Sequence, residues 1–178
     1  MRFAALAFAC FVVGCSGAGP YGYSRTYSPL GEEEQALANS REFDPVMAQR
    51  VPDEWKKARV NFFGVVKSRK DAPGGGAYLT LGMRTLGTRN LCDEADEDTC
   101  RVTVSAREHA SVHAVVRLRS GDDLGKLSVQ PGSLLRLVGQ LGDDVDPADG
   151  GPVLRAEFYR HWPRGEFVTM ADSEHMRR

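Results

Sequence analysis

From Arg59 onward, hydrophobic and polar residues alternate in short runs rich in β-branched and aromatic side chains. Alternation with a period of two is typical of half-buried β-strands. Glycine-rich or acidic stretches separate the runs, as turns between strands do. The pattern predicts five strands, at residues 60–68, 77–86, 101–105, 133–141 and 152–162. The less regular stretch that contains His109 and His113 fits either a strand or a helix.

The residues before Arg59 predict short helices instead. Residues 32–41 place acidic side chains in the first turn and Arg41 in the last, which suits the helix dipole. Asp44-Pro45 has the residue types of an N-cap and a first helical position, and Pro52 predicts a second helix start. We expect Trp55 to plug one end of the β-structure, with ligand stacking as the alternative.

Together these elements predict a mainly β protein. Five short strands, with Gly64 marking a bulge or a sharp coil in the first, are typical of a small OB-like Greek-key barrel. The length after the N-terminal region suits a single domain. We expect the following division: a signal peptide at 1–14, a lipidated N-terminus and flexible tether at 15–31, a short helical segment at 32–58, the barrel at 59–169 and a polar tail at 170–178.

The N-terminus has the parts of a secretory signal, namely Arg2, a short apolar run and Gly14 before Cys15. The segment Val12-Val13-Gly14-Cys15 resembles the lipobox of bacterial lipoproteins. The resemblance implies that Cys15 is acylated, with palmitate among its chains, and holds the protein at a membrane. In that family Ser16, rather than aspartate, implies the outer membrane of the cell envelope, facing the periplasm. An ordinary signal cleavage that leaves Cys15 as a plain thiol is the alternative.

The remaining cysteines follow from this interpretation. Cys10 leaves with the signal peptide and Cys15 carries the lipid, so Cys92 and Cys100 remain. Two cysteines in an exported domain predict one disulfide bond. A metal site built on the two thiolates is the alternative, although the sequence has no Cys-x-x-Cys spacing to support it.

The charge balance bears on the partner. The chain has 23 basic and 24 acidic residues, and removal of Arg2 leaves a formal charge of −2. General nucleic-acid binders depend on a basic face that contacts phosphates. We therefore do not expect nucleic acid as the partner.

A second resemblance extends over roughly residues 53–163. Trp55-Lys-Lys-Ala-Arg-Val-Asn-Phe-Phe-Gly-Val-Val, Gly132-Ser-Leu-Leu-Arg-Leu-Val-Gly-Gln-Leu and the final His161-Trp-Pro are similar to segments of small OB-type outer-membrane lipoproteins. The starvation-inducible lipoprotein (Slp) family is the one that they resemble. The resemblance implies an envelope lipoprotein with an OB-type barrel.

Two groups of residues could bind a metal ion. His109 and His113 are four residues apart and would share one face of a helix, whereas on a strand they would lie about 13 Å apart, too far to share an ion. The acidic run at 93–98 and the acidic turn at 142–151 could offer oxygen ligands to calcium. Neither acidic stretch has the spacing of a known calcium loop, so we expect solvated charges and no metal or other cofactor. The turn contributes Asp143, Asp144, Asp146 and Asp149.

The sequence offers no nucleophile or paired carboxylates in a catalytic arrangement, so we expect a protein that is not an enzyme. We expect a lipid-anchored binding or scaffolding module for a cell-envelope complex, with envelope proteins as partners. An OB-groove binder of an oligosaccharide or anionic polymer is one alternative, and a metal-dependent envelope enzyme is another. The candidate contacts lie on the predicted second strand, the loop before it and the end of the last strand: Arg69, Lys70, Tyr78, Thr80, Arg84, His161 and Trp162.

Overall fold

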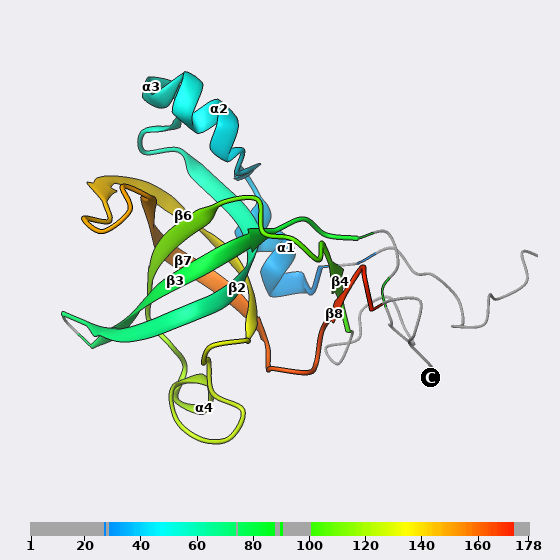
Figure 1. The fold of residues 1–178 in the computed structure, drawn as a ribbon. Helices are drawn as coiled ribbons and strands as arrows, with labels where there is room; N and C mark the ends of the chain where they lie inside the picture. The colour runs from blue at the N-terminus through cyan, green and yellow to red at the C-terminus, as the bar shows by residue number, and fades with distance from the viewer. Residues whose placement is uncertain (1–26, 28, 74, 88–89, 91–100, 173–178) are drawn as a thin grey trace, which may run out of the picture.

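The structure, a computed structural model, describes residue 27 and residues 29–73, 75–87, 90 and 101–172. Four short helices and eight strands make up this part of the chain (Figure 1). The helices are α1 (Gly31–Leu37), α2 (Pro45–Arg50), α3 (Pro52–Trp55) and α4 (Ser120–Asp123). The strands are β1 (Arg41–Glu42), β2 (Arg59–Ala72), β3 (Gly76–Arg84), β4 (Thr103–Val104), β5 (Ser111–Val116), β6 (Leu134–Val145), β7 (Pro152–Trp162) and β8 (Val168–Thr169).

Five of the strands close into a barrel. Their order is β2-β3-β5-β7-β6, and β6 pairs with β2 to complete the ring. All neighbours are antiparallel except β5 and β7, which run parallel. A closed Greek-key barrel with one parallel pair leaves no open edge and is the arrangement of an OB-type barrel. The prediction of a small five-stranded OB-like barrel is confirmed.

The third barrel strand differs from the prediction. Residues 101–105 contribute only the two-residue β4, which pairs with β8 outside the barrel. The strand between β3 and β7 is β5, from the stretch whose pattern fitted strand or helix equally. Its residues Val112, Ala114 and Val116 are buried and belong to the main core. Three small or β-branched inward residues therefore favour the strand, although the apolar Val115 on the outer face interrupts their alternation in the sequence.

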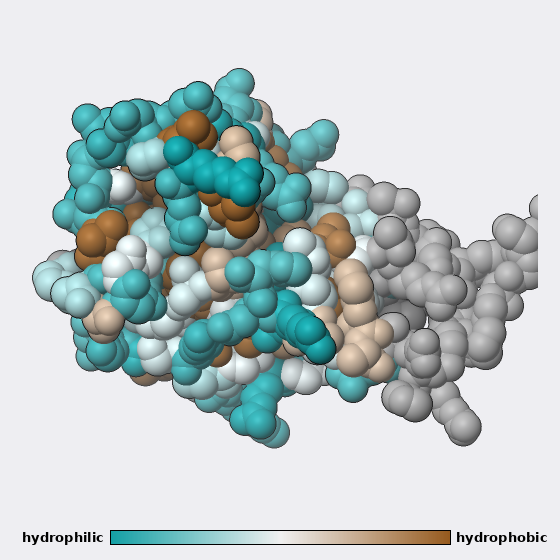
Figure 2. Space-filling view, turned by 45° about the horizontal axis from the view of Figure 1, so that its top comes forward, coloured by the Kyte–Doolittle hydropathy of each residue, from teal (hydrophilic) through white to brown (hydrophobic). Residues whose placement is uncertain are grey.

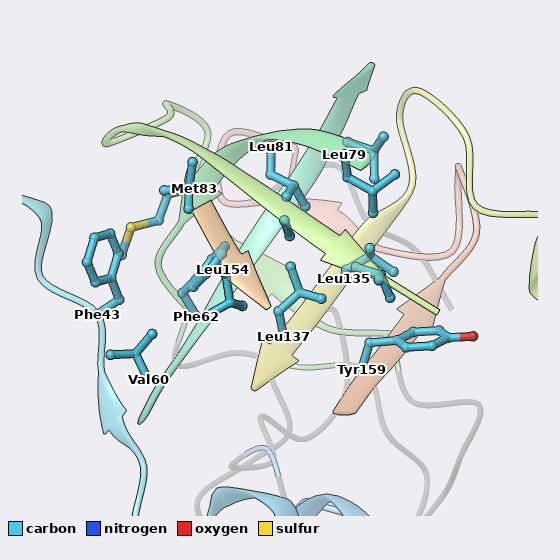
Figure 3. Packing of buried hydrophobic residues seen from close by; sticks show 14 of the residues in the cluster. Phe43, Val60, Phe62, Leu79, Leu81, Met83, Leu135, Leu137, Leu154 and Tyr159 are labelled. Atoms are coloured by element: carbon cyan, nitrogen blue, oxygen red, sulfur yellow. The ribbon is translucent and has the colours of Figure 1, made fainter. Parts of the chain in front are cut away.

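The barrel interior is the main hydrophobic core (Figure 3). Inward residues alternate along each strand, as with Leu79, Leu81 and Met83 on β3. Phe43 and Trp55 close the end of the barrel at the start of β2, where their rings meet edge to face at 5.6 Å. Trp55 is only 8% exposed, so it packs as the plug that the sequence predicts.

Three register shifts shape the barrel strands, and the last of them lies between Leu141 and Val145 of β6. In β2 the register shifts between Val66 and Ser68, a short distance beyond the glycine expected to mark a bulge. Gly64 itself allows close packing, because a Cβ there would lie 3.0 Å from Cβ of Leu81. A second shift, between Val138 and Gly139, lets β6 and β7 coil around the barrel.

A second, smaller core lies on the outside of the barrel. It contains Tyr27, Phe63 and Trp162 together with Val102, Val104 and Leu134. Beside it, the carboxylate of Glu33 on α1 is completely buried and contacts Arg136 of β6 at 2.8 Å and Arg160 of β7 at 3.0 Å. Tyr27 also donates a hydrogen bond to this carboxylate. The charged contacts fasten the N-terminal helix to the barrel.

The boundaries of the helices follow local chemistry. Asp44 caps α2, because its carboxylate accepts hydrogen bonds from the amides of Val46 at 2.9 Å and Met47 at 3.0 Å. Pro52 begins α3, as predicted. The first helix ends at Leu37, four residues earlier than expected, and Asn39 adopts a positive φ of 60°.

Among the described residues, none of the helices has the length and apolar character needed to cross a bilayer.

Candidate binding groove

A groove of about 600 Å³ opens between α2–α3 and the turn that joins β6 to β7. One wall comes from residues 43–56, the other from residues 141–152, and residues 109–111 complete the lining. Figure 2 brings the helices toward the viewer, and apolar side chains lie among hydrophilic ones in the hollowed upper part of this face. A concave site of this volume with mixed lining is in the size range of ligand pockets.

The helical wall is held in place by the barrel plug. Phe43 and Trp55 anchor its two ends in the core, and the guanidinium of Arg41 covers the Trp55 ring at 3.6 Å. Between these anchors, the N-cap at Asp44 starts α2 and leaves Val46 and Met47 facing outward. Their exposed fractions are 54% and 40%, which is unusual for large apolar side chains.

The opposite wall is the β6–β7 turn, residues 146–151, with Val145 and Pro152 at its ends. Val145 is 61% exposed. Backbone hydrogen bonds of 2.8 Å cross the turn, from Asp146 N–H to the Gly151 carbonyl and from Gly150 N–H to the Asp146 carbonyl. Gly150 has a φ of +71°, a conformation that glycine adopts without strain.

Behind this wall the turn is attached to the outer face of β3 and β5 through His113. Nε2 of His113 lies 2.9 Å from Oδ1 of Asp149, and its Nδ1 lies 3.5 Å from Oδ2 of Asp146. The Tyr78 hydroxyl donates a 2.6 Å hydrogen bond to the same Asp146 oxygen, and the Tyr78 ring stacks on the imidazole at 5.7 Å. The His113 side chain is only 4% exposed.

These contacts shift the ionisation of the groups involved. The hydrogen bond from Tyr78 is the largest cause of the lowered pKa of Asp146, and the backbone amide of Gly151 is the largest cause of the lowered pKa of Asp149. Burial and the hydrogen bond to Asp146 raise the pKa of Tyr78 above its ordinary value. Both carboxylates are therefore held in their charged form against His113.

Five of the seven predicted contact residues occupy three separate places. Tyr78 and Thr80 lie together at His113, where Thr80 Oγ1 is 3.4 Å from Nδ1. Arg69 donates hydrogen bonds to the carbonyls of Asp123 and Val129, 3.0 Å each, while Lys70 is exposed. The Arg84 guanidinium donates to the carbonyls of Ser105 and Ala106. The structure thus uses three of these side chains, Arg69, Tyr78 and Arg84, to hold loops against the barrel.

The last two predicted residues lie near the other end of β7. His161 is 2.7 Å from Asp122 of α4, which also accepts a 2.7 Å hydrogen bond from Tyr159. Burial opposes ionisation of Asp122, but the bonds from Tyr159 and His161 outweigh it and lower its pKa. Trp162 is 3% exposed and packs in the outer core. Neither residue lies among those that line the groove.

The metal-binding alternatives can be compared with the geometry. His109 contacts Thr85 and His113 contacts the turn, so the two histidines have different partners. Of the acidic turn, Asp144 pairs with Arg155 at 3.2 Å. Ligand atoms of His113, Asp146 and Asp149, one from each, lie within 4.8 Å of one another, a separation at which the three side chains could hold a metal ion. Because these two carboxylates face different ring nitrogens, the arrangement is that of a histidine held between acids.

Several predictions fall outside the described residues. They are lipidation at Cys15, the disulfide bond between Cys92 and Cys100, and the acidic run at 93–98.

Neither a protein-family model nor a curated protein sequence matches this chain. Function is therefore inferred from the site. The seven predicted contact residues lie on β2, β3 and β7, and none of them lines the groove. The exposed Val46 and Val145 of the groove resemble ordinary core positions in a hydropathy pattern. The proline-led starts of α2 and α3, which the sequence does show, are the signal that a short helical wall stands beside the barrel.

Proposed function

We propose that the protein is a lipid-anchored lipoprotein of the cell envelope that binds a segment of a partner protein in the groove between α2–α3 and the β6–β7 turn. The observation that carries this proposal is the pair of apolar side chains, Val46 and Val145, exposed on opposite walls of one groove of about 600 Å³. Exposed apolar groups around a concavity mark interaction sites more often than isolated surface residues do.

The chemistry of the lining favours a protein segment with apolar side chains. Three prolines, Pro45, Pro52 and Pro152, add rigid apolar surface to the exposed Val46 and Val145, whereas Phe43 and Trp55 are almost fully buried. The turn wall adds the exposed carboxylates of Asp143 and Asp149. An apolar segment flanked by lysine or arginine therefore fits both the surface and the charge of the groove.

The position of the groove suits an anchored protein. Tyr27, the first described residue, packs on Phe63 and Trp162 at the end of β6 and β7 where Leu134 pairs with Trp162. The groove lies at the other end, near Leu141 and Pro152. Seven residues of strand, about 23 Å, separate Leu134 from Leu141. A chain anchored at Cys15 would thus enter the domain at one end and present the groove at the other.

Binding of an anionic polymer has less support from the geometry. Arg69 and Lys70 are the basic candidates for such a contact, but the guanidinium of Arg69 is engaged by the connection between β5 and β6. The carboxylates on the groove wall would also repel a polyanion. Lys70 is exposed and is the basic residue of this pair that would contact such a ligand.

Site-specific photo-crosslinking in intact cells tests the proposal. A photoreactive amino acid replaces Val145 on the groove wall, and a matched variant carries it at Leu124, an equally apolar residue that is 78% exposed near α4. We expect one predominant adduct from position 145, which mass spectrometry maps to an apolar segment with a basic neighbour in an envelope protein.

The control decides how the adduct is interpreted. Position 124 should give none of this adduct, and a Val46→Asp substitution on the opposite wall should remove it from position 145. Equal adducts from both positions, or an adduct that survives Val46→Asp, would contradict binding in the groove. Metabolic labelling with palmitate, compared with a Cys15→Ser variant, tests the anchor separately.

A further inference from the structure

We propose that the β5–β6 connection, residues 117–133, docks on the anionic phospholipid surface that carries the anchor, through Leu124, Lys126 and Leu127. This inference rests on the lipid anchor of the proposed function and goes beyond it, because it assigns a second contact surface away from the groove. The contact fixes how the anchored domain faces the membrane, and it is tested without a groove partner.

Two leucines of this connection are left in water. Leu124 is 78% exposed and Leu127 is 62% exposed, the two largest exposed fractions among the large apolar side chains that the structure describes. Lys126 lies between them in the sequence and is exposed as well. Apolar side chains beside a basic one are typical of segments that lie in a membrane interface, where the apolar groups enter the headgroup region and the cation meets lipid phosphates.

The base of the connection is fastened to the barrel. The amide of Val129 donates a 2.7 Å hydrogen bond to the carbonyl of Asp122 and so closes the loop. Arg69 of β2 donates 3.0 Å hydrogen bonds to the carbonyls of Asp123 and Val129. Val129 itself is completely buried in the main core. The two leucines are thus exposed on a loop whose base is already packed.

The charges of the connection favour an anionic surface. Its two acids are engaged by the barrel, because Asp122 accepts a 2.7 Å hydrogen bond from Tyr159 and Asp123 pairs with Arg69. The exposed Lys126 lies between the leucines instead. Lipid phosphates attract a cation at this position, and that attraction adds to the apolar contacts.

The connection and the N-terminal chain reach the same end of the barrel. On β7, Trp162 packs against Tyr27, the first described residue, with the ring centroids 6.2 Å apart. The neighbouring His161 lies 2.7 Å from Asp122 of α4. Figure 1 shows α4 below the barrel and α2–α3 above it. The entry of the chain and the connection therefore share the end that lies opposite the groove.

The length of the tether brings the membrane surface within reach. Cys15 lies twelve residues before Tyr27, and a chain of that length spans at most about 40 Å. An anchored domain therefore stays next to the bilayer, and a short tether gives it an effective concentration on the order of millimolar there. Two leucines and a lysine are too weak to hold a free protein at a membrane, but they suffice to orient one that is already anchored.

Fluorescence quenching in the full lipidated chain tests the docking. An environment-sensitive fluorescent amino acid replaces Leu127, and a matched variant carries it at Val145, which is similarly exposed at 61% but lies at the far end of β6. Each protein is reconstituted into vesicles of phosphatidylcholine and phosphatidylglycerol that contain a lipid with a nitroxide on its acyl chain. We expect the nitroxide to quench the probe at position 127 and to leave the emission at position 145 unchanged.

Two changes should weaken the quenching at position 127. Leu124→Asp should lower the ratio of docked to undocked domains about tenfold, because one leucine loses its contact and a negative charge is placed against the lipid phosphates. Vesicles of phosphatidylcholine alone should quench less, because Lys126 then meets no net negative charge. Val46→Asp is the matched control, since Val46 is 54% exposed on the groove wall, and it should leave the quenching unchanged.

Flotation of the vesicles separates the ways in which the inference can fail. Protein that floats but shows no quenching at position 127, or equal quenching at both positions, overturns the docking and leaves the anchor and the groove intact. Protein that does not float refutes the anchor of the proposed function and the docking with it. Absence of quenching combined with a dimer that Leu124→Asp dissociates in sedimentation would assign the leucines to a second copy of the chain. Quenching at position 127 without a groove adduct from position 145 would leave the docking standing and refute partner binding in the groove.

Discussion

Glu33 Oε2 accepts a 3.0 Å hydrogen bond from Nη1 of Arg160, although 127 residues separate the two in the chain. The Glu33 side chain has no exposure to solvent, and Arg136, opposite Arg160 in the β6–β7 register, contacts its other oxygen. One carboxylate thus lies between two guanidiniums on neighbouring strands. It joins the N-terminal helix to the barrel at the end away from the groove.

Replacing Glu33 by glutamine should destabilise the fold. The substitution removes the negative charge that both guanidiniums face, and breaking a buried ion pair costs about 3 kcal/mol or more. Urea unfolding should show a lower midpoint. Glu34→Gln, at the exposed neighbouring position of the same helix, should change the free energy of unfolding by less than about 0.5 kcal/mol. Equal midpoints for the two variants would show that the buried contacts do not stabilise the protein.

Gly139→Ala should be among the most damaging small substitutions in the barrel. A Cβ at Gly139 would lie 2.1 Å from the carbonyl oxygen of Arg155, so the two backbones of the bulge would have to separate. We expect a loss of about 2–3 kcal/mol, measured by thermal or urea unfolding. Gly142→Ala on the same strand is the control, since its nearest neighbours would be 3.6 Å away.

Removal of the α2 cap should loosen the helical wall of the groove. Asp44→Ala deletes the acceptor for the amides of Val46 and Met47 and should cost about 1 kcal/mol, whereas Asp44→Ser should retain most of the stability. Circular dichroism during unfolding gives the free energy, and hydrogen exchange of the Met47 amide reports the cap directly. Unchanged exchange in Asp44→Ala would show that the cap does not hold the wall.

Tyr78→Phe should alter the acid range of stability. The Tyr78 hydroxyl is the largest cause of the lowered pKa of Asp146, so its removal should raise that pKa toward the ordinary value, as carbon NMR of the carboxyl group would show. A depressed carboxyl pKa contributes stability that is present above the unfolded-state value of about 4 and is lost as the pH falls through the folded-state value. The stability difference between the proteins should therefore be present at pH 6 and shrink in acid. A difference that stays constant from pH 6 to pH 2 would assign the effect to packing.

Alternating hydrophobic residues made much of the barrel predictable. β2, β3, β6 and β7 contain enough inward apolar positions for their period to stand out, and the predicted strand at 152–162 coincides with β7. The pattern of β5 fits a strand or a helix, and the third strand is predicted at 101–105 instead, because β5 is short and its outward Val115 is apolar. The burial of His113 depends on a turn that comes more than thirty residues later. The contact between His113 and this turn cannot be predicted from the residues around His113 alone.

The candidate site was less predictable than the fold. In the sequence the acidic turn and His113 are separate features, since only the pairing of β7 with β5 and β6 brings them together. The groove depends on the side chains that remain exposed after packing. Val46 and Val145 have the same hydropathy as the buried Val60 and Val112, and their exposure of 54% and 61% is decided by tertiary structure alone.

The most direct measurement of groove binding is the affinity of the segment recovered by crosslinking at position 145. As a synthetic peptide, it should bind the full chain in a calorimetric titration about tenfold or more tightly than it binds the Val46→Asp variant, because a charge would replace a contacting apolar group. Leu127→Asp, at a residue that is 62% exposed but absent from the groove lining, should bind as the unmodified protein does. Equal affinity for all three proteins would contradict the groove as the site of partner binding.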